Sequence, residues 1–334
     1  RSLVAKSKAK KEGTIMYKLI GKTITCILVT LLIFSARVTG ENLSPKGMVT
    51  GYAHSTTMLL NGKILIVGGH NITPLSTARI YTPNTNAVTP TGSMEHPMRV
   101  WHKATLLPSG KVLITGGASK TGLTSSAELY DPTTNNFLPA GIMRIARYAH
   151  TATVLPSGKV LIVGGYNAGL LSSAELYDPV KNTFIPTGMM ENKRVWHTAT
   201  LLPSGKVLIT GGGIGSTYLS TAELYDPTTG NFTPTGTLGK GKYWHTATLL
   251  SNGKVLIAGG NTQTGFTSTV ELYDPATGTF TSSNALRAER GNHIATLLHD
   301  GQVLIEAGID NNKSTPLEEL YDPNLPLVAG EGAS

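Results

Sequence analysis

Short apolar runs separated by turn residues make up most of the chain. In one stretch the runs HTATLL (197–202), KVLITGG (206–212), STAELY (220–225) and NFTPTG (231–236) follow one another. They are rich in Val, Ile, Leu, Thr and aromatic residues, as β-strands are. No helical periodicity is present beyond residue 40. The pattern therefore predicts an all-β protein built from short strands.

Two kinds of turn connect these runs. Pro-Ser-Gly joins the first run to the second, which is typical of a tight hairpin. Asp-Pro-Thr-Thr-Gly follows the third run, where Asp caps the turn, Pro fixes φ and Gly supplies a positive φ. Each unit is therefore expected to form one sheet of four antiparallel strands.

The unit repeats along the chain with a period of 47 or 48 residues. The equivalent histidines are His54, His102, His150, His197, His245 and His293. A glycine pair closes the second run at Gly68-Gly69, Gly116-Gly117, Gly164-Gly165, Gly211-Gly212 and Gly259-Gly260, with Ala307-Gly308 in the last copy. A tyrosine ends the third run at Tyr81, Tyr130, Tyr177, Tyr225, Tyr273 and Tyr321. Six copies of this size predict a repeat architecture in which sheets pack face to face around an axis, a six-bladed β-propeller.

The chain resembles the kelch family, which includes the propeller domain of the galactose oxidase group. The resemblance rests on the double glycine, on Glu-Leu-Tyr-Asp-Pro, and on an aromatic residue seven positions after the tyrosine. That aromatic residue is Phe137, Phe184, Phe232 or Phe280, while Val88 and Val328 hold the position in the outer copies. The resemblance covers roughly residues 42–332 and implies four antiparallel strands per blade. The tryptophan-aspartate signature of the other common propeller repeat is absent from the sequence.

The sequence leaves open how the ring closes. Residues 328–332 can supply the outer strand of blade six, but LSPKGM at 43–48 resembles FIPTGM at 184–189 and can supply it instead. A piece of a longer, seven-bladed chain is the rival to a six-bladed ring.

The first forty residues resemble an export leader. Met16 precedes Lys18, Lys22 and the apolar run 24–34, and small residues at 38–40 offer a cleavage site before Glu41. This apolar run is short for a membrane span, although an uncleaved anchor is the alternative. We expect an upstream segment at 1–15, a signal peptide at 16–40 and a propeller at 41–334. The protein is then exported, periplasmic or extracellular, and of bacterial type.

Charge and cysteine content narrow the functional classes. Of 28 basic and 20 acidic residues, 8 basic and 1 acidic precede Glu41, so residues 41–334 keep 20 basic and 19 acidic, a net charge of +1. That balance gives no case for a nucleic-acid partner. The single cysteine, Cys26, lies in the leader, so the expected mature chain has no disulfide and no thiol nucleophile or ligand. We expect a monomer without cofactor or metal, which could meet a membrane only if the leader is retained.

The two ends of the blades differ in variability. Antiparallel strands put the Pro-Ser-Gly and Asp-Pro turns on one face, and these turns are nearly identical in every copy. The loops after the glycine pair lie on the other face with the blade connections, and they differ in every copy. Because binding residues usually sit on variable loops of a rigid scaffold, the variable face is the predicted binding face.

Candidate ligand-binding residues gather just before the repeat histidine. The resemblance implies that the following strand is the innermost one, which puts these residues near the mouth of the central channel. They are Trp101, Trp196 and Trp244, with the cations Arg99, Arg147, Arg194, Lys242 and Arg290. Tyr166, Tyr218 and Phe266 lie in variable loops of the same face. Aromatic planes beside guanidinium groups suit sugar rings and acidic glycans.

Each candidate also has a structural interpretation. The histidines can be hydrogen-bonding groups of the frame, and the tryptophans can cap blade junctions. The cations can pair with Glu95, Glu191 and Glu289 in the same connections. The tyrosines and the repeat glutamates are interpreted as blade packing; these glutamates are Glu128, Glu175, Glu223, Glu271 and Glu319.

Two functions follow. The first is a non-catalytic recognition module that binds a protein or glycan partner through the variable face. The second is a carbohydrate-active enzyme resembling a kelch-type sialic acid mutarotase, with Glu95, Glu191 or Glu289 as general acid and base. Copper chemistry of the galactose oxidase type requires a cysteine-crosslinked tyrosine, which the expected mature chain cannot form. Adhesion is a third possibility that no residue selects.

Overall fold

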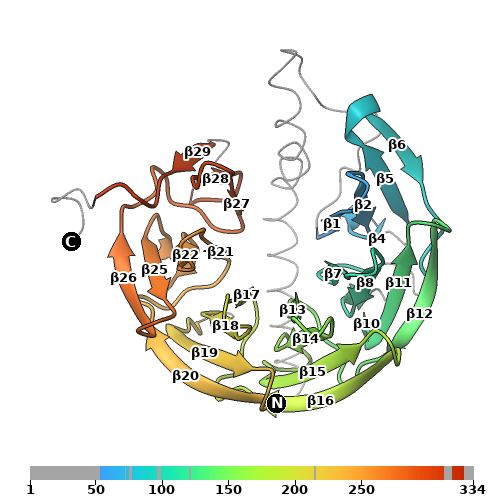
Figure 1. Ribbon diagram of the computed structural model, residues 1–334, viewed down its shortest axis with the longest axis horizontal. Coiled ribbons are helices and arrows are strands. Elements are labelled where there is room, and N and C mark those ends of the chain that lie inside the picture. The colour runs from blue at the N-terminus through green and yellow to red at the C-terminus, as the bar shows by residue number, and fades with distance from the viewer. Residues whose placement is uncertain are drawn as a thin grey trace, which may run out of the picture.

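Six antiparallel sheets stand around a common axis in the structure, a computed structural model (Figure 1). The structure describes residues 53–71, 73–74, 77–95, 99–119, 122–213, 216–311 and 318–326. Within these ranges the only helical segment is the 3-10 turn η2 (Pro83–Thr85), and no helix could span a membrane. The all-β, six-bladed prediction is confirmed, while the expected leader at 1–40 lies outside the described residues.

The strands of the blades run outward from the axis in chain order. Blade one contains β1 (Ser55–Met58), β2 (Ile64–Val67), β5 (Ala78–Thr82) and β6 (Ala87–Pro90). Blade two contains β7 (Lys103–Leu106), β8 (Val112–Thr115), β11 (Ser126–Asp131) and β12 (Asn136–Ile142). Blade three contains β13 (Thr151–Val154), β14 (Val160–Val163), β15 (Ser173–Asp178) and β16 (Thr183–Met189). Blade four contains β17 (Thr198–Leu201), β18 (Val207–Thr210), β19 (Thr221–Asp226) and β20 (Asn231–Thr237). Blade five contains β21 (Thr246–Leu249), β22 (Val255–Ala258), β25 (Val270–Asp274) and β26 (Thr279–Ser283).

Blade six has three strands within the described residues, β27 (Ile294–Leu297), β28 (Val303–Glu306) and β29 (Glu319–Tyr321). Both segments predicted to supply its outer strand, 43–48 and 328–332, lie outside the described residues, as does Val328. Among the described residues, three variable loops form small two-stranded ribbons. These are β3 (His70–Asn71) with β4 (Thr73–Pro74), β9 (Ala118–Ser119) with β10 (Gly122–Leu123), and β23 (Asn261–Thr262) with β24 (Gly265–Phe266).

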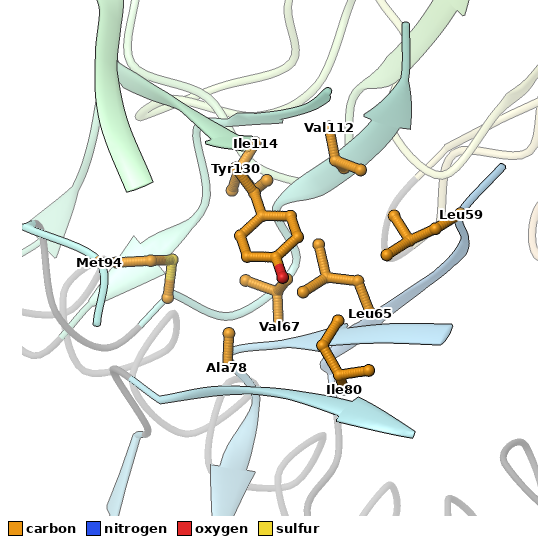
Figure 2. Packing of buried hydrophobic residues seen from close by; sticks show 9 residues of the cluster. All are labelled: Leu59, Leu65, Val67, Ala78, Ile80, Met94, Val112, Ile114 and Tyr130. Carbon is orange, nitrogen blue, oxygen red and sulfur yellow. The ribbon is translucent and has the colours of Figure 1, made fainter. Parts of the chain in front are cut away.

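Hydrophobic cores lie between successive blades. In blades two to five, the second strand is an apolar run that sends alternate side chains to the two neighbouring blades, so its residues are buried on both faces. In β8, Val112 and Ile114 pack on blade one, whereas Leu113 packs on blade three. Figure 2 shows the first of these cores, where Val112 and Ile114 meet Leu65 and Val67 of β2. Each fully buried side chain of this kind contributes about 2 kcal/mol of transfer free energy.

The end blades differ from the inner ones. The innermost strands touch in the order β1, β7, β13, β17, β21 and β27, and in Figure 1 blades one and six stand at the two ends of the arc. On the β28 face that looks away from blade five, Glu306 stands where β2 has Val67 and β8 has Thr115. Burial, and secondarily the charge of Glu318, raises the pKa of Glu306 to about 7. The last described blade therefore carries an acid where the inner blades carry small neutral residues.

Candidate ligand-binding site at the channel mouth

The blade connections and the variable loops lie on the same face, as predicted. Backbone bridges join Val100 to Ala118 and Tyr243 to Asn261, so the residue two before the histidine pairs with the loop after the glycine pair. On the opposite face, a lysine of the first turn pairs with the aspartate of the third in blades two to five, as in Lys206 Nζ to Asp226 Oδ2 at 3.2 Å. Hence the near-identical turns share the other face.

A chain of backbone hydrogen bonds links the blades at the mouth of the channel. In blades two to six, the residue before the repeat histidine donates its N–H to the carbonyl oxygen of its counterpart in the preceding blade, over 2.8 to 3.4 Å. All six residues have a left-handed backbone, with φ between 51° and 62°. In chain order they are Ala53, Trp101, Ala149, Trp196, Trp244 and Asn292. The frame thus requires this backbone conformation in every blade.

Tryptophan is an unexpected residue for that conformation. A left-handed backbone crowds Cβ against the next carbonyl and costs roughly 1 kcal/mol or more for a residue other than Gly, Asn or Asp. Alanine and asparagine fill the position in the other blades, which shows that the frame does not need an indole there. Bulky residues kept in strained conformations concentrate at binding and catalytic sites. The choice of tryptophan in three blades therefore points to a ligand.

The tryptophans belong to a continuous cluster of seven aromatic rings, here called the mouth cluster. Centroids of Trp101 and Trp196 are 6.1 Å apart, and those of Trp196 and Trp244 are 5.9 Å apart, both edge to face. Tyr148 and Tyr166 extend the cluster at the Trp101 end, and Tyr243 and Tyr218 extend it at the Trp244 end. All seven rings are partly exposed. Such rings provide stacking surfaces of fixed orientation.

A cavity of about 180 Å³ opens between the tryptophans and the innermost strands. It is lined by Ala53, His54, Thr56, Trp101, His102, Lys103, Ala149, Trp196, Trp244 and Asn292. Sites that enclose a drug-sized ligand span roughly 300 to 1,000 Å³, so this one fits a single small ring. The lining combines indole faces, one ammonium group and one side-chain amide.

The predicted cationic ligand residues lie beneath this site, fully buried. Arg99, Arg147, Arg194, Lys242 and Arg290 each have no exposed surface. Their partners are the repeat glutamates of the blades that follow, as in Arg194 Nη2 to Glu223 Oε1 at 2.9 Å. The predicted pairing with Glu95, Glu191 and Glu289 is wrong, because those residues are exposed and the glutamates of the third strands face inward. These cations thus offer no side-chain surface to a ligand.

Each buried pair ties one blade connection to the next blade. Arg194 Nη1 donates to the carbonyl oxygens of Gly211 and Thr221, and Nη2 donates to the Thr221 hydroxyl and to Glu223. The other oxygen of Glu223 accepts the N–H of Glu191. Burial lowers the pKa of the arginine, and Glu223 opposes that shift. The hydrogen bonds and the carboxylate together compensate for removing the charge from water.

The repeat histidines bond adjacent blades. In five of them Nε2 lies 2.7 to 3.1 Å from a Ser or Thr hydroxyl of the preceding blade, as in His245 with Thr198 and Thr210. Burial, with Lys242 as the next cause, lowers the pKa of His245 to about 3, so the imidazole is neutral. Within the described part of the chain, no three His, Cys, Asp or Glu residues are arranged to hold a metal ion.

The structure does not bring the candidate catalytic acids together. Glu95, Glu191 and Glu289 lie on three separate blade connections, and none of them lines the cavity. Of the three aromatic residues predicted in the variable loops, two join the mouth cluster and one does not. Tyr166 and Tyr218 belong to the mouth cluster, whereas Phe266 lies against Gly291 and has no ring contact among the described residues.

Tyr148, Tyr243, Lys103 and Asn292 belong to the site but were not identified from the sequence. Tyr148 and Tyr243 stand two positions before the repeat histidine, where Val100 and Val195 stand in other blades. An aromatic residue in that register was the available signal, since the tryptophans occupy the next position. Lys103 begins the innermost strand of blade two, where other blades have Ser, Thr or Ile. One charge at an otherwise uncharged repeat position was its signal.

Comparison with known families finds one relationship. The Kelch motif matches residues 147–187 and 199–239, which correspond to most of blades three and four. No curated protein matches the chain at a significant level.

Proposed function

We propose, since the chain is a kelch-repeat β-propeller, that it is a non-catalytic recognition module whose variable face binds a glycan or glycan-bearing protein. The fold marks the chain as a binding or interaction module, and the partner has to be argued from the site. The mouth cluster is the proposed contact surface. Export of the mature chain from Glu41 onward, predicted from the leader, forms part of the proposal.

One observation carries this proposal: partly exposed indoles occupy a strained position that alanine and asparagine also fill. Packing alone does not account for that choice, since the inter-blade hydrogen bonds form in blades without tryptophan. Aromatic faces stack on the apolar faces of sugar rings, and the neighbouring amide of Asn292 can bond a hydroxyl. A small cavity within a broader aromatic surface suits one sugar of a longer chain.

A glycan array probed with the 41–334 protein tests the proposal. We expect binding to a defined group of glycans, and at least tenfold weaker binding by Trp196→Ala and Trp244→Ala, whose stacking surface is removed. Lys206→Ala, on the face of the near-identical turns, is the matched control and should bind like the parent.

Folding of each variant is checked by circular dichroism and thermal melting. Retained binding by both tryptophan variants, with loss in Lys206→Ala, would place the contact on the wrong face and refute the proposal. If no glycan binds, a pull-down from culture medium or periplasm with parent and Trp196→Ala decides the matter. A partner captured equally by both would also contradict the mouth cluster.

A further inference from the structure

The channel beneath the mouth cluster contains a lysine that has no ion-pair partner among the described residues. Lys103 is the first residue of β7 and lines the cavity together with Trp101 and His102. No carboxylate of the described residues lies within ion-pair distance of its ammonium group, whereas Lys111, Lys206 and Lys242 all have such partners. Its side chain is accessible to solvent within the channel.

The charge of Lys103 acts on several blades. It contributes to lowering the pKa of His102, His150 and His197, which belong to blades two, three and four. The charge thus acts across the innermost part of the propeller, as expected for a residue that lines the cavity. Partial desolvation by the surrounding strands lowers the pKa of Lys103 itself, and no carboxylate among the described residues pairs with it to oppose that shift.

The rest of the cavity lining carries no compensating charge. The other lining residues are hydroxyl, amide, imidazole, indole or alanine groups, and His102 is neutral because its pKa is about 3. At the equivalent position blades three, four and five have Thr151, Thr198 and Thr246, so the frame does not require a lysine. A cation that has protein on several sides attracts an anion more strongly than one on an open surface, because less water screens it.

We propose that Lys103 binds the negative charge of a sugar acid whose ring stacks on the tryptophans above it. The ligand class is a monosaccharide unit with one carboxylate, such as a hexuronic acid, and Lys103 is the residue that selects the acid over the neutral sugar. This inference rests on the proposed glycan recognition and adds the charge of the ligand to it.

Tryptophan fluorescence measures this binding directly. The chain has three tryptophans, and all three belong to the mouth cluster, so any ligand-dependent change reports on this site. Glucuronate and glucose form a matched pair of probes that differ only in the carboxylate, and galacturonate and galactose form a second pair. Titrations with the 41–334 protein extend to roughly 50 mM, because single sugars bind with only a few kcal/mol.

We expect each acid to bind the parent at least tenfold more tightly than its neutral partner. Lys103→Thr, which introduces the residue of blades three to five, should abolish that preference, so that each acid and its neutral partner bind this variant with affinities within twofold of each other. Lys111→Thr, an exposed lysine on the opposite face, is the control and should keep the preference. Thermal melting confirms that both variants fold.

Three results would overturn the inference. Equal affinity for acid and neutral sugar, or an acid preference that survives in Lys103→Thr, removes Lys103 as the selecting group but leaves glycan recognition intact. Absence of a fluorescence change with all four sugars rejects the sugar-acid assignment, while the array experiment with Trp196→Ala still decides the proposed function separately.

Discussion

Arg194 and Trp196 stand two residues apart in one blade connection, and the sequence singles out both as ligand contacts. Arg194 has no exposed surface and four hydrogen bonds, whereas Trp196 is partly exposed beside a cavity. The position of Arg194 holds a cation in five blades, whereas the position of Trp196 holds a tryptophan in only three. Side chains common to nearly all blades therefore serve the shared frame, and those that differ between blades are available for a ligand.

The largest expected effect on stability comes from acid, which acts on the buried histidines that hold the blades together and not on the residues at the channel mouth. The pKa values of His102, His245 and His293 are about 3 in the fold, against about 6.5 in an unfolded chain. The unfolded state binds more protons in this range, so stability is full above pH 6.5 and falls as pH drops towards 3. Three such histidines give a slope of up to about 4 kcal/mol per pH unit. Urea unfolding at pH 7, 6, 5 and 4 measures it, and a flat profile would contradict the buried neutral imidazoles.

Substitution of a glycine in the repeated glycine pair should cause the next largest loss of stability. Gly164 has a φ of 61°, and a Cβ there would stand 2.7 Å from the Arg194 carbonyl oxygen and 2.8 Å from His197 Cε1. Gly164→Val therefore combines a backbone clash with a left-handed β-branched residue, which we expect to cost roughly 5 kcal/mol or more. Thermal melting checks this. Gly158→Ala is the control, because Gly158 also has a positive φ but no atom within 4 Å of an added Cβ.

Removal of one buried cation should destabilise the frame by about 4 kcal/mol. Arg194→Met leaves Glu223 buried without its partner, which is more costly than losing the pair as a whole. Arg194→Lys should recover part of that loss, because Lys242 makes the equivalent pair in blade five. Its ammonium group donates to Glu271 and to the Thr269 hydroxyl. Denaturant unfolding of the three proteins checks the order. An Arg194→Met variant as stable as the parent would show that the pair does not hold the blade.

The fold could be predicted from the sequence because six copies repeat the same evidence. The strands, the turns, the faces they occupy and the glycine pair each recur, and every copy supports the same sheet. The buried pairs were mispredicted because Glu191 is near Arg194 in the sequence, whereas Glu223 is 29 residues away and comes close only through sheet pairing. Sequence proximity within a connection gives no information on which side chain faces inward.

The site was partly predictable for the same reason. The three tryptophans occupy the same position of the repeat, so the sequence alone predicts that they lie together at the channel mouth. The sequence marks Lys103 as an exception within the repeat but does not place it in the cavity, because its exposure inside the channel depends on how the innermost strands of other blades surround it. The cavity has the same dependence, since Trp101 and Asn292 come together only when blades two and six stand around one axis.

The smallest expected effect on stability belongs to the mouth. In Trp196→Asn, loss of the edge contacts to Trp101, Tyr148 and Trp244 costs about 1 kcal/mol each, and relief of the left-handed strain returns about 1 kcal/mol. Asn292 occupies the same backbone conformation in blade six, so the inter-blade hydrogen bonds can persist. We expect the free energy of unfolding to fall by no more than about 2 kcal/mol while glycan binding is lost.

Arg194→Lys supplies the opposite case: reduced stability with unchanged binding, since its side chain does not reach the cavity. Denaturant unfolding and fluorescence titration of these two variants separate the neighbouring positions. A Trp196→Asn protein that binds normally but unfolds several kcal/mol more easily would make the indole part of the frame. The strained backbone would then be explained by packing, and the cavity would have no stacking wall left to recognise a sugar.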